Sequence, residues 1–120
     1  MAMVENWKLV VLERYTKFDG RAGRAEFWWF ALANFLVIVA LAILVAVSNI
    51  FLILYIGYAL AVIVPSIAVA IRRLHDTNKS GWWLLIGLIP FGALVLLVFY
   101  ILVGTAGPND HGAAPERAAG

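Results

Sequence analysis

The sequence predicts an all-α integral membrane fold, in which an interfacial amphipathic helix precedes three transmembrane helices. Residues 27–71 contain no charged side chain, and this run is about twice the ~20 apolar residues that one helix needs to cross a bilayer. Hydrophobic residues make up 64% of the 120-residue chain, which is too high a fraction for an ordinary soluble domain. Most of the surface is therefore expected to face lipid, in a single membrane domain over residues 1–115.

Residues 3–18 show the pattern of an amphipathic helix. Apolar side chains recur there at intervals of three and four residues, at Val4, Trp7, Val11, Tyr15 and Phe18. Charged side chains occupy other positions around the helix, which is typical of a helix that lies in the membrane interface. A helix packed on a soluble partner is the alternative. The glycine of Asp19-Gly20 is expected to end the helix.

Three apolar segments are predicted to cross the membrane, at residues 27–47, 50–71 and 82–103. The polar pair Ser48-Asn49 is the expected turn between the first two. Pro65 lacks a backbone donor and is expected to kink the second helix. The first segment is longer than a signal-peptide core of about 7–15 residues, so we expect a retained anchor. The last residues, 113–120, are expected to be a disordered tail.

The third segment allows a second topology. It contains Gly87, Pro90 and Gly92, so it could instead form a re-entrant hairpin that reverses at residues 90–92 and leaves the tail inside. Lysine and arginine cluster before residue 27 and again at residues 72–79, whereas the turn at 48–49 has none. The positive-inside rule therefore places the N-terminus and residues 72–81 in the cytoplasm. Three crossings would then place the C-terminus in the periplasm.

Two basic and aromatic segments, which we call the cassettes, flank the long apolar run at residues 20–30 and 72–83. Two crossings bring them to the same side of the membrane, where arginine pairs could hold an anionic lipid head group or a protein partner. The alternative is that they only fix topology and join the helices. The predicted binding residues are Arg21, Arg24, Arg72, Arg73 and Lys79. The predicted structural pairing residues are Glu26, Asp76 and His75, and the predicted interfacial anchors are Trp28, Trp29, Trp82 and Trp83.

The residue inventory argues against several functions. The chain has no cysteine, and His75 beside Asp76 provides too few ligands for a zinc site. We therefore expect no catalytic residue, metal or cofactor. Nucleic-acid binding is not expected either, because the basic residues adjoin apolar spans. The favoured function is a small non-enzymatic membrane protein, and the alternative is a homo-oligomeric transport or channel subunit. Asn34, the one strongly polar side chain within the spans, is expected to form a hydrogen bond between helices.

The cassettes also carry a family resemblance. The matching stretches are FDGRAGRAEFWW at residues 18–29, RRLHDTNKSGWW at residues 72–83 and the glycine-rich segment at residues 104–112. In these the chain resembles the small bacterial inner-membrane proteins called domain of unknown function 805, or YhaH-like proteins. His111 stands where that family more often has an aromatic residue. The resemblance implies a bacterial inner-membrane location and brings no established activity, substrate or catalytic residue.

Overall fold

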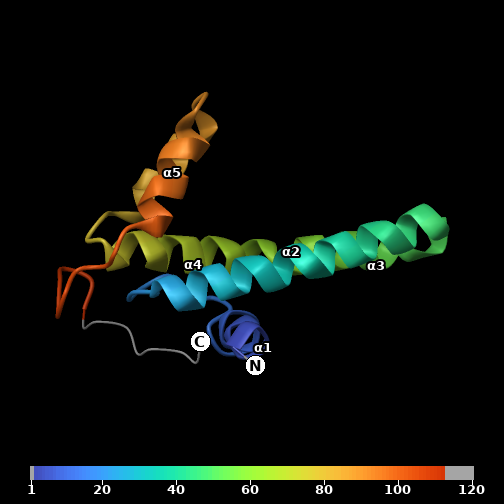
Figure 1. Ribbon diagram of the computed structural model, residues 1–120, viewed down its shortest axis with the longest axis horizontal. Helices are drawn as coiled ribbons and strands as arrows, with labels where there is room; N and C mark the ends of the chain where they lie inside the picture. The colour runs from blue at the N-terminus through green and yellow to red at the C-terminus, as the bar shows by residue number, and fades with distance from the viewer. Residues whose placement is uncertain (1, 113–120) are drawn as a thin grey trace.

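The computed structural model describes residues 2–112, and every regular element in that range is a helix (Figure 1). Two helical stretches are long and apolar enough to cross a membrane, α2 (Arg24–Val47) and the stretch Asn49–Asp76. The second consists of a 3-10 turn η2 (Asn49–Phe51), α3 (Leu52–Ala61) and α4 (Ile63–Asp76). The two stretches lie side by side as the long axis of the molecule. The all-α prediction is confirmed for these residues, whereas the predicted tail at 113–120 lies outside them.

A short turn joins the two long helices at the predicted polar pair. Ser48 adopts an extended backbone after α2 ends, and its hydroxyl accepts a hydrogen bond from the Ile50 amide at 3.4 Å. The serine therefore caps the next helix with its own side chain. The chain reverses within a few residues, and α3 returns along α2.

The second long helix is interrupted near Pro65, between α3 and α4. Proline has no N–H to donate to the carbonyl four residues earlier, which is that of Ala61. The α3 helix ends at Ala61, and Val62, with φ −92° and ψ −2°, separates it from α4 although its amide still donates to the Tyr58 oxygen at 3.0 Å. The Tyr15 hydroxyl donates a hydrogen bond of 2.5 Å to the Ala61 carbonyl oxygen. A side chain from the N-terminal segment thus satisfies the acceptor that the proline leaves open.

The N-terminal segment begins with α1 (Ala2–Lys8), which continues into one π-helical turn η1 (Leu9–Glu13). The helical part is therefore shorter than the predicted 3–18. Figure 1 shows α1 nearly end-on beneath α2, so its axis crosses that of the long helices. Trp7 Nε1 donates to the Tyr58 hydroxyl at 3.0 Å, and that hydroxyl donates to Asn34 Oδ1 at 2.7 Å. This series of hydrogen bonds joins α1, α3 and α2.

The third apolar segment does not form the single helix predicted over 82–103. It forms a 3-10 helix η3 (Gly81–Leu88), a turn, and α5 (Gly92–Ile101). Pro90 cannot continue a helical ladder and restricts the residue before it, and Phe91 takes a left-handed backbone with φ 66°. A Cβ at Gly92 would lie 1.6 Å from the Ile86 carbonyl oxygen, so the close approach of the two arms requires glycine there.

The hairpin returns to the end of the molecule from which it started. In Figure 1 α5 leaves the α2–α4 pair at the end where α4 finishes and points away from the long axis. The backbone oxygen of Tyr100, near the end of α5, accepts hydrogen bonds from Trp28 and Arg73 of the two cassettes. The described tail residues therefore lie beside the cassettes and not at the other end of the helix pair, because the glycine–proline turn sends the chain back.

The buried apolar core is small and lies at the same end. It consists of Val10, Ala22, Phe30 and Val69, with Trp7, Val11 and Phe27 packed against it. Most large apolar side chains of α2 and α3 are exposed instead, including Phe35, Ile43 and Ile53. This distribution suits helices whose surroundings are lipid rather than water.

Candidate functional site: an ionic cluster at one end of the helix pair

Four arginines share two carboxylates where the cassettes meet, and we call these six residues the ionic cluster. Glu26, in the first turn of α2, holds Arg14 Nη1 at 2.7 Å and Arg72 Nη1 at 2.5 Å, one on each oxygen. Asp76, in the last turn of α4, holds Arg21 Nε at 3.0 Å and Arg73 Nη1 at 2.6 Å. All of these side chains are buried except that of Arg14, which is 25% exposed.

Backbone carbonyls accept most of the other arginine N–H groups. Arg73 Nε donates to the Tyr100 oxygen at 3.0 Å, and its Nη2 donates to the oxygen of Leu102. The same guanidinium reaches the Ala22 oxygen at 3.3 Å, so one side chain joins α4, the first cassette and the end of α5. Such carbonyls solvate a buried cation where water is excluded. Arg73 therefore acts as a structural hub.

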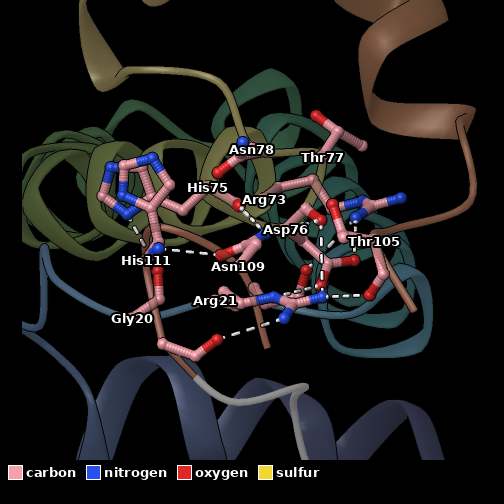
Figure 2. Close-up of polar contacts among 12 residues, drawn as sticks. Gly20, Arg21, Arg73, His75, Asp76, Thr77, Asn78, Thr105, Asn109 and His111 are labelled. Carbon is pink, nitrogen blue, oxygen red and sulfur yellow. Dashed lines mark hydrogen bonds and ion pairs between the residues drawn. The ribbon is translucent and has the colours of Figure 1, made fainter. Parts of the chain in front are cut away.

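The tail after α5 binds across the same cluster (Figure 2). Arg21 Nη1 donates to the Gly107 oxygen at 2.6 Å, and Arg21 Nη2 donates to the Thr105 oxygen at 2.5 Å. The Thr105 amide in turn donates to the backbone oxygen of Asp76 at 2.7 Å. A Cβ at Gly104 would lie 1.9 Å from Asp76 Oδ2. Residues 104–112, which we call the strap, thus lie directly on the ionic cluster.

Two further contacts hold the strap near the end of α4. The rings of His75 and His111 are stacked with centroids 3.9 Å apart, and Asn109 Nδ2 donates to the His75 backbone oxygen at 3.0 Å. His75 Nδ1 also lies 2.8 Å from the Gly20 oxygen. Three crossings would place His111 across the membrane from His75, whereas the hairpin brings the two rings together.

Burial sets the direction of the pKa shift of Arg73, in the ionic cluster, and of His75 beside it, both beyond the predicted span 50–71. Burial lowers the pKa of Arg73, while the neighbouring Asp76 carboxylate acts in the opposite direction and the charge of Arg24 adds to the lowering. Burial also lowers the pKa of His75, an effect that its contact with the Gly20 oxygen opposes. The arrangement therefore favours a neutral His75.

The predicted binding residues fall into two groups. Arg21, Arg72 and Arg73 are buried and bonded within the protein, although Arg72 Nη2 has no hydrogen-bond partner among residues 2–112. The Arg24 side chain is exposed and forms no hydrogen bond or ion pair with residues 2–112. The Lys79 ammonium lies 4.7 Å from the centre of the Phe99 ring. Only Arg24 and Lys79 are placed to meet a molecule from outside.

The predicted aromatic anchors also separate into packed and open side chains. Trp28 Nε1 donates to the Tyr100 oxygen at 3.1 Å, and Trp83 packs edge-on against Phe99 with centroids 5.6 Å apart. Trp82 remains 78% exposed. Trp29 is half-buried on α2.

The sequence reasoning missed Arg14 and the strap. Arg14 was assigned to the charged face of an interfacial helix, but the helix ends at Glu13 and the arginine turns to Glu26. The strap residues Thr105 and Gly107 act through backbone oxygens, which side-chain identity does not reveal. The close spacing of glycines at 104, 107 and 112 was the one available signal.

Comparisons with known proteins agree with the family resemblance. Residues 15–113 match the family model described as a protein of unknown function, DUF805. The chain is 45% identical to the inner membrane protein YhaI of Escherichia coli K12 over 112 residues, which cover 92% of this chain and 95% of the relative. It is 41% identical to the inner membrane protein YhaH of the same strain over 117 residues, covering 92% and 97%. No solved structure matches the chain.

Proposed function

The chain belongs to the DUF805 family, and from that premise we propose that it is a non-enzymatic bacterial inner-membrane protein whose ionic-cluster end holds anionic lipid head groups. The family carries no described activity, and the curated relatives are named only as inner membrane proteins. The proposal therefore rests on the chemistry of the cluster and its surroundings.

The proposed membrane arrangement has two crossings. α2 and the α3–α4 stretch are long enough to span, and the positive-inside rule puts the ionic cluster on the cytoplasmic side. The hairpin at residues 81–101 would then lie in the cytoplasmic leaflet, with the strap beneath it. This is the re-entrant alternative, and the support for it is that Tyr100 and Thr105 are hydrogen-bonded to the cassettes.

The observation that carries the lipid proposal is the unequal charge of the cluster. Four guanidiniums face two carboxylates, so two positive charges are balanced only by carbonyl dipoles. Arg24, which stands one turn before Trp28, adds a further exposed cation that acts on Arg73. A phosphate held at Arg24 would offset this repulsion, and arginine binds phosphate through paired N–H groups.

The proposed binding group is therefore smaller than the predicted set of five basic residues. Arg24 and Lys79 would contact the head group, whereas Arg21, Arg72 and Arg73 would supply positive potential from inside. Exposed Trp82 has the amphipathic ring that prefers the depth of the head groups. Its neighbour Trp83 helps to hold the hairpin there through Phe99.

Native mass spectrometry of the detergent-purified protein tests the proposal. Arg24→Gln should reduce retention of phosphatidylglycerol or cardiolipin by about fivefold, because a basic residue at an anionic surface contributes ~1 kcal/mol. Lys8→Gln is the matched control, since Lys8 is also exposed and carries the same charge but lies on α1. Equal loss in both variants would mean that the protein senses only general surface charge.

A further inference from the structure

A groove between α2 and α4 lies within the apolar run. Its volume is about 360 Å³, and it is lined by apolar side chains of both helices together with Asn34 and Ser66. The groove is open to the surroundings of the helix pair. In a bilayer its occupant is either lipid tails or protein, and the two polar side chains decide between them.

Asn34 brings unpaired donors to this groove. The Trp7 N–H donates to the Tyr58 oxygen, so the Tyr58 proton is directed to Asn34 Oδ1 at 2.7 Å. This fixes the amide orientation, with the Asn34 nitrogen away from Tyr58. Within residues 2–112 that nitrogen donates to no acceptor, and the Ser66 hydroxyl likewise forms no hydrogen bond. Two polar groups with unused hydrogen-bonding capacity therefore share one apolar groove.

The position of Asn34 along α2 argues against water and lipid tails as hydrogen-bond partners of its amide. It stands seven residues after Phe27, where the apolar run begins, which is about 10 Å along a helix. In the proposed membrane arrangement this depth lies within the apolar layer, where water is scarce and an unpaired amide is costly. Lipid tails contain no acceptor. The occupant must therefore be a protein segment that carries a polar group at the same depth.

We propose that this groove is the interface with a second copy of the chain, in which the two Asn34 amides pair across a twofold axis. Both copies insert in the same orientation, so the axis lies along the membrane normal and the two Asn34 side chains stand at equal depth. Each Oδ1 keeps a lone pair beyond the one that Tyr58 uses. Each nitrogen can then donate to the oxygen of the other copy, as in symmetric interfaces generally.

The lining of the groove suits close helix approach. Ala31 and Ser66 are small, and small residues let membrane helices come near enough for side-chain hydrogen bonds. Phe35, which is 61% exposed on the same wall, would enter the groove of the other copy. The dimer proposal shares the two-crossing arrangement with the lipid proposal but uses none of the residues named for lipid binding, so either proposal can fail alone.

Cysteine cross-linking in native membranes tests the interface, because the chain contains no cysteine of its own. Ile38→Cys places the only thiol four residues after Asn34, on the groove wall. Leu36→Cys is the control, since Leu36 is 46% exposed and points about 160° away from Asn34 around the helix. Oxidation at low expression should give a dimer band several times stronger for Ile38→Cys.

A second substitution tests the role of the amide. Asn34→Leu in the Ile38→Cys background should weaken association roughly three- to tenfold, as expected for a lost hydrogen bond between membrane helices. Tyr58→Phe removes the other partner of Asn34 and should leave the dimer intact. Equal cross-linking of Ile38→Cys and Leu36→Cys would overturn the proposal even if Asn34→Leu failed to insert. Unchanged cross-linking after Asn34→Leu would overturn it as well.

Discussion

Arg21 and Asp76, which come one from each cassette, form a buried ion pair in which Arg21 Nε lies 3.0 Å from Asp76 Oδ1. The two residues are 55 positions apart in the chain. The same carboxylate holds Arg73 through its other oxygen. One acidic side chain therefore joins the loop before α2 to the end of α4, and the strap covers both.

We expect Asp76→Ala to destabilise the protein by about 3–5 kcal/mol, because it leaves two buried guanidiniums without their carboxylate. Thermal unfolding in detergent measures the effect. Glu13→Ala is the control, since Glu13 is exposed and belongs to no ion pair within residues 2–112. Equal shifts in the midpoint of unfolding would contradict the coupling of the two cassettes.

The contacts of the strap predict that the C-terminus faces the cytoplasm. A fluorescent reporter that matures only in the cytoplasm, fused after residue 120, should be bright. The matched alkaline phosphatase fusion at the same point should be inactive, whereas a phosphatase fusion truncated after Ser48 should be active. High phosphatase activity after residue 120 would restore the model with three crossings.

The glycine at the start of the strap should tolerate no side chain. We expect Gly104→Ala to destabilise the protein by more than ~1 kcal/mol, because the new Cβ would lie 1.9 Å from Asp76 Oδ2. Gly57→Ala is the control, since a Cβ at that position meets nothing within 4 Å and alanine is the better helix former. Thermal unfolding should separate the two variants; similar midpoints would show that the strap does not rest on Asp76.

Much of the fold follows from composition and periodicity. The uncharged run at residues 27–71 and the polar pair Ser48-Asn49 predict two long helices and the turn between them, as the structure has them. The spacing of Arg73 and Asp76 is that of an ion pair on one helix. These features depend on residues close together in the chain, where sequence patterns are informative.

The hairpin and the strap were harder to predict because they depend on distant backbone contacts. A run of about 20 apolar residues is long enough to cross, so the sequence left both a straight helix at 82–103 and a reversal at residues 90–92 open. The close approach of Gly92 to Ile86 belongs to the hairpin. The strap binds through carbonyl oxygens, which every residue possesses. From the sequence, the cassette arginines are expected to meet and to remain available for a ligand. The number of backbone carbonyl oxygens that accept their N–H groups cannot be counted from the sequence.

Tyr15 and Pro65 should be energetically coupled through one backbone oxygen. Pro65 deprives the Ala61 carbonyl of its helical partner, and the Tyr15 hydroxyl supplies the replacement. Tyr15→Phe should therefore cost about 0.5–1.5 kcal/mol, the usual net contribution of one hydrogen bond within a protein. Tyr55→Phe is the control, because the Tyr55 hydroxyl forms no hydrogen bond within residues 2–112.

The coupling can be measured by a double-mutant cycle in detergent. Pro65→Ala restores an N–H that can donate to the Ala61 oxygen, so Tyr15→Phe should cost much less in that background than in the parent. The difference between the two costs is the interaction energy of the pair. If Tyr15→Phe shifts the unfolding midpoint equally with and without Pro65, the hydroxyl does not compensate for the proline, and Tyr15 contributes only through its ring.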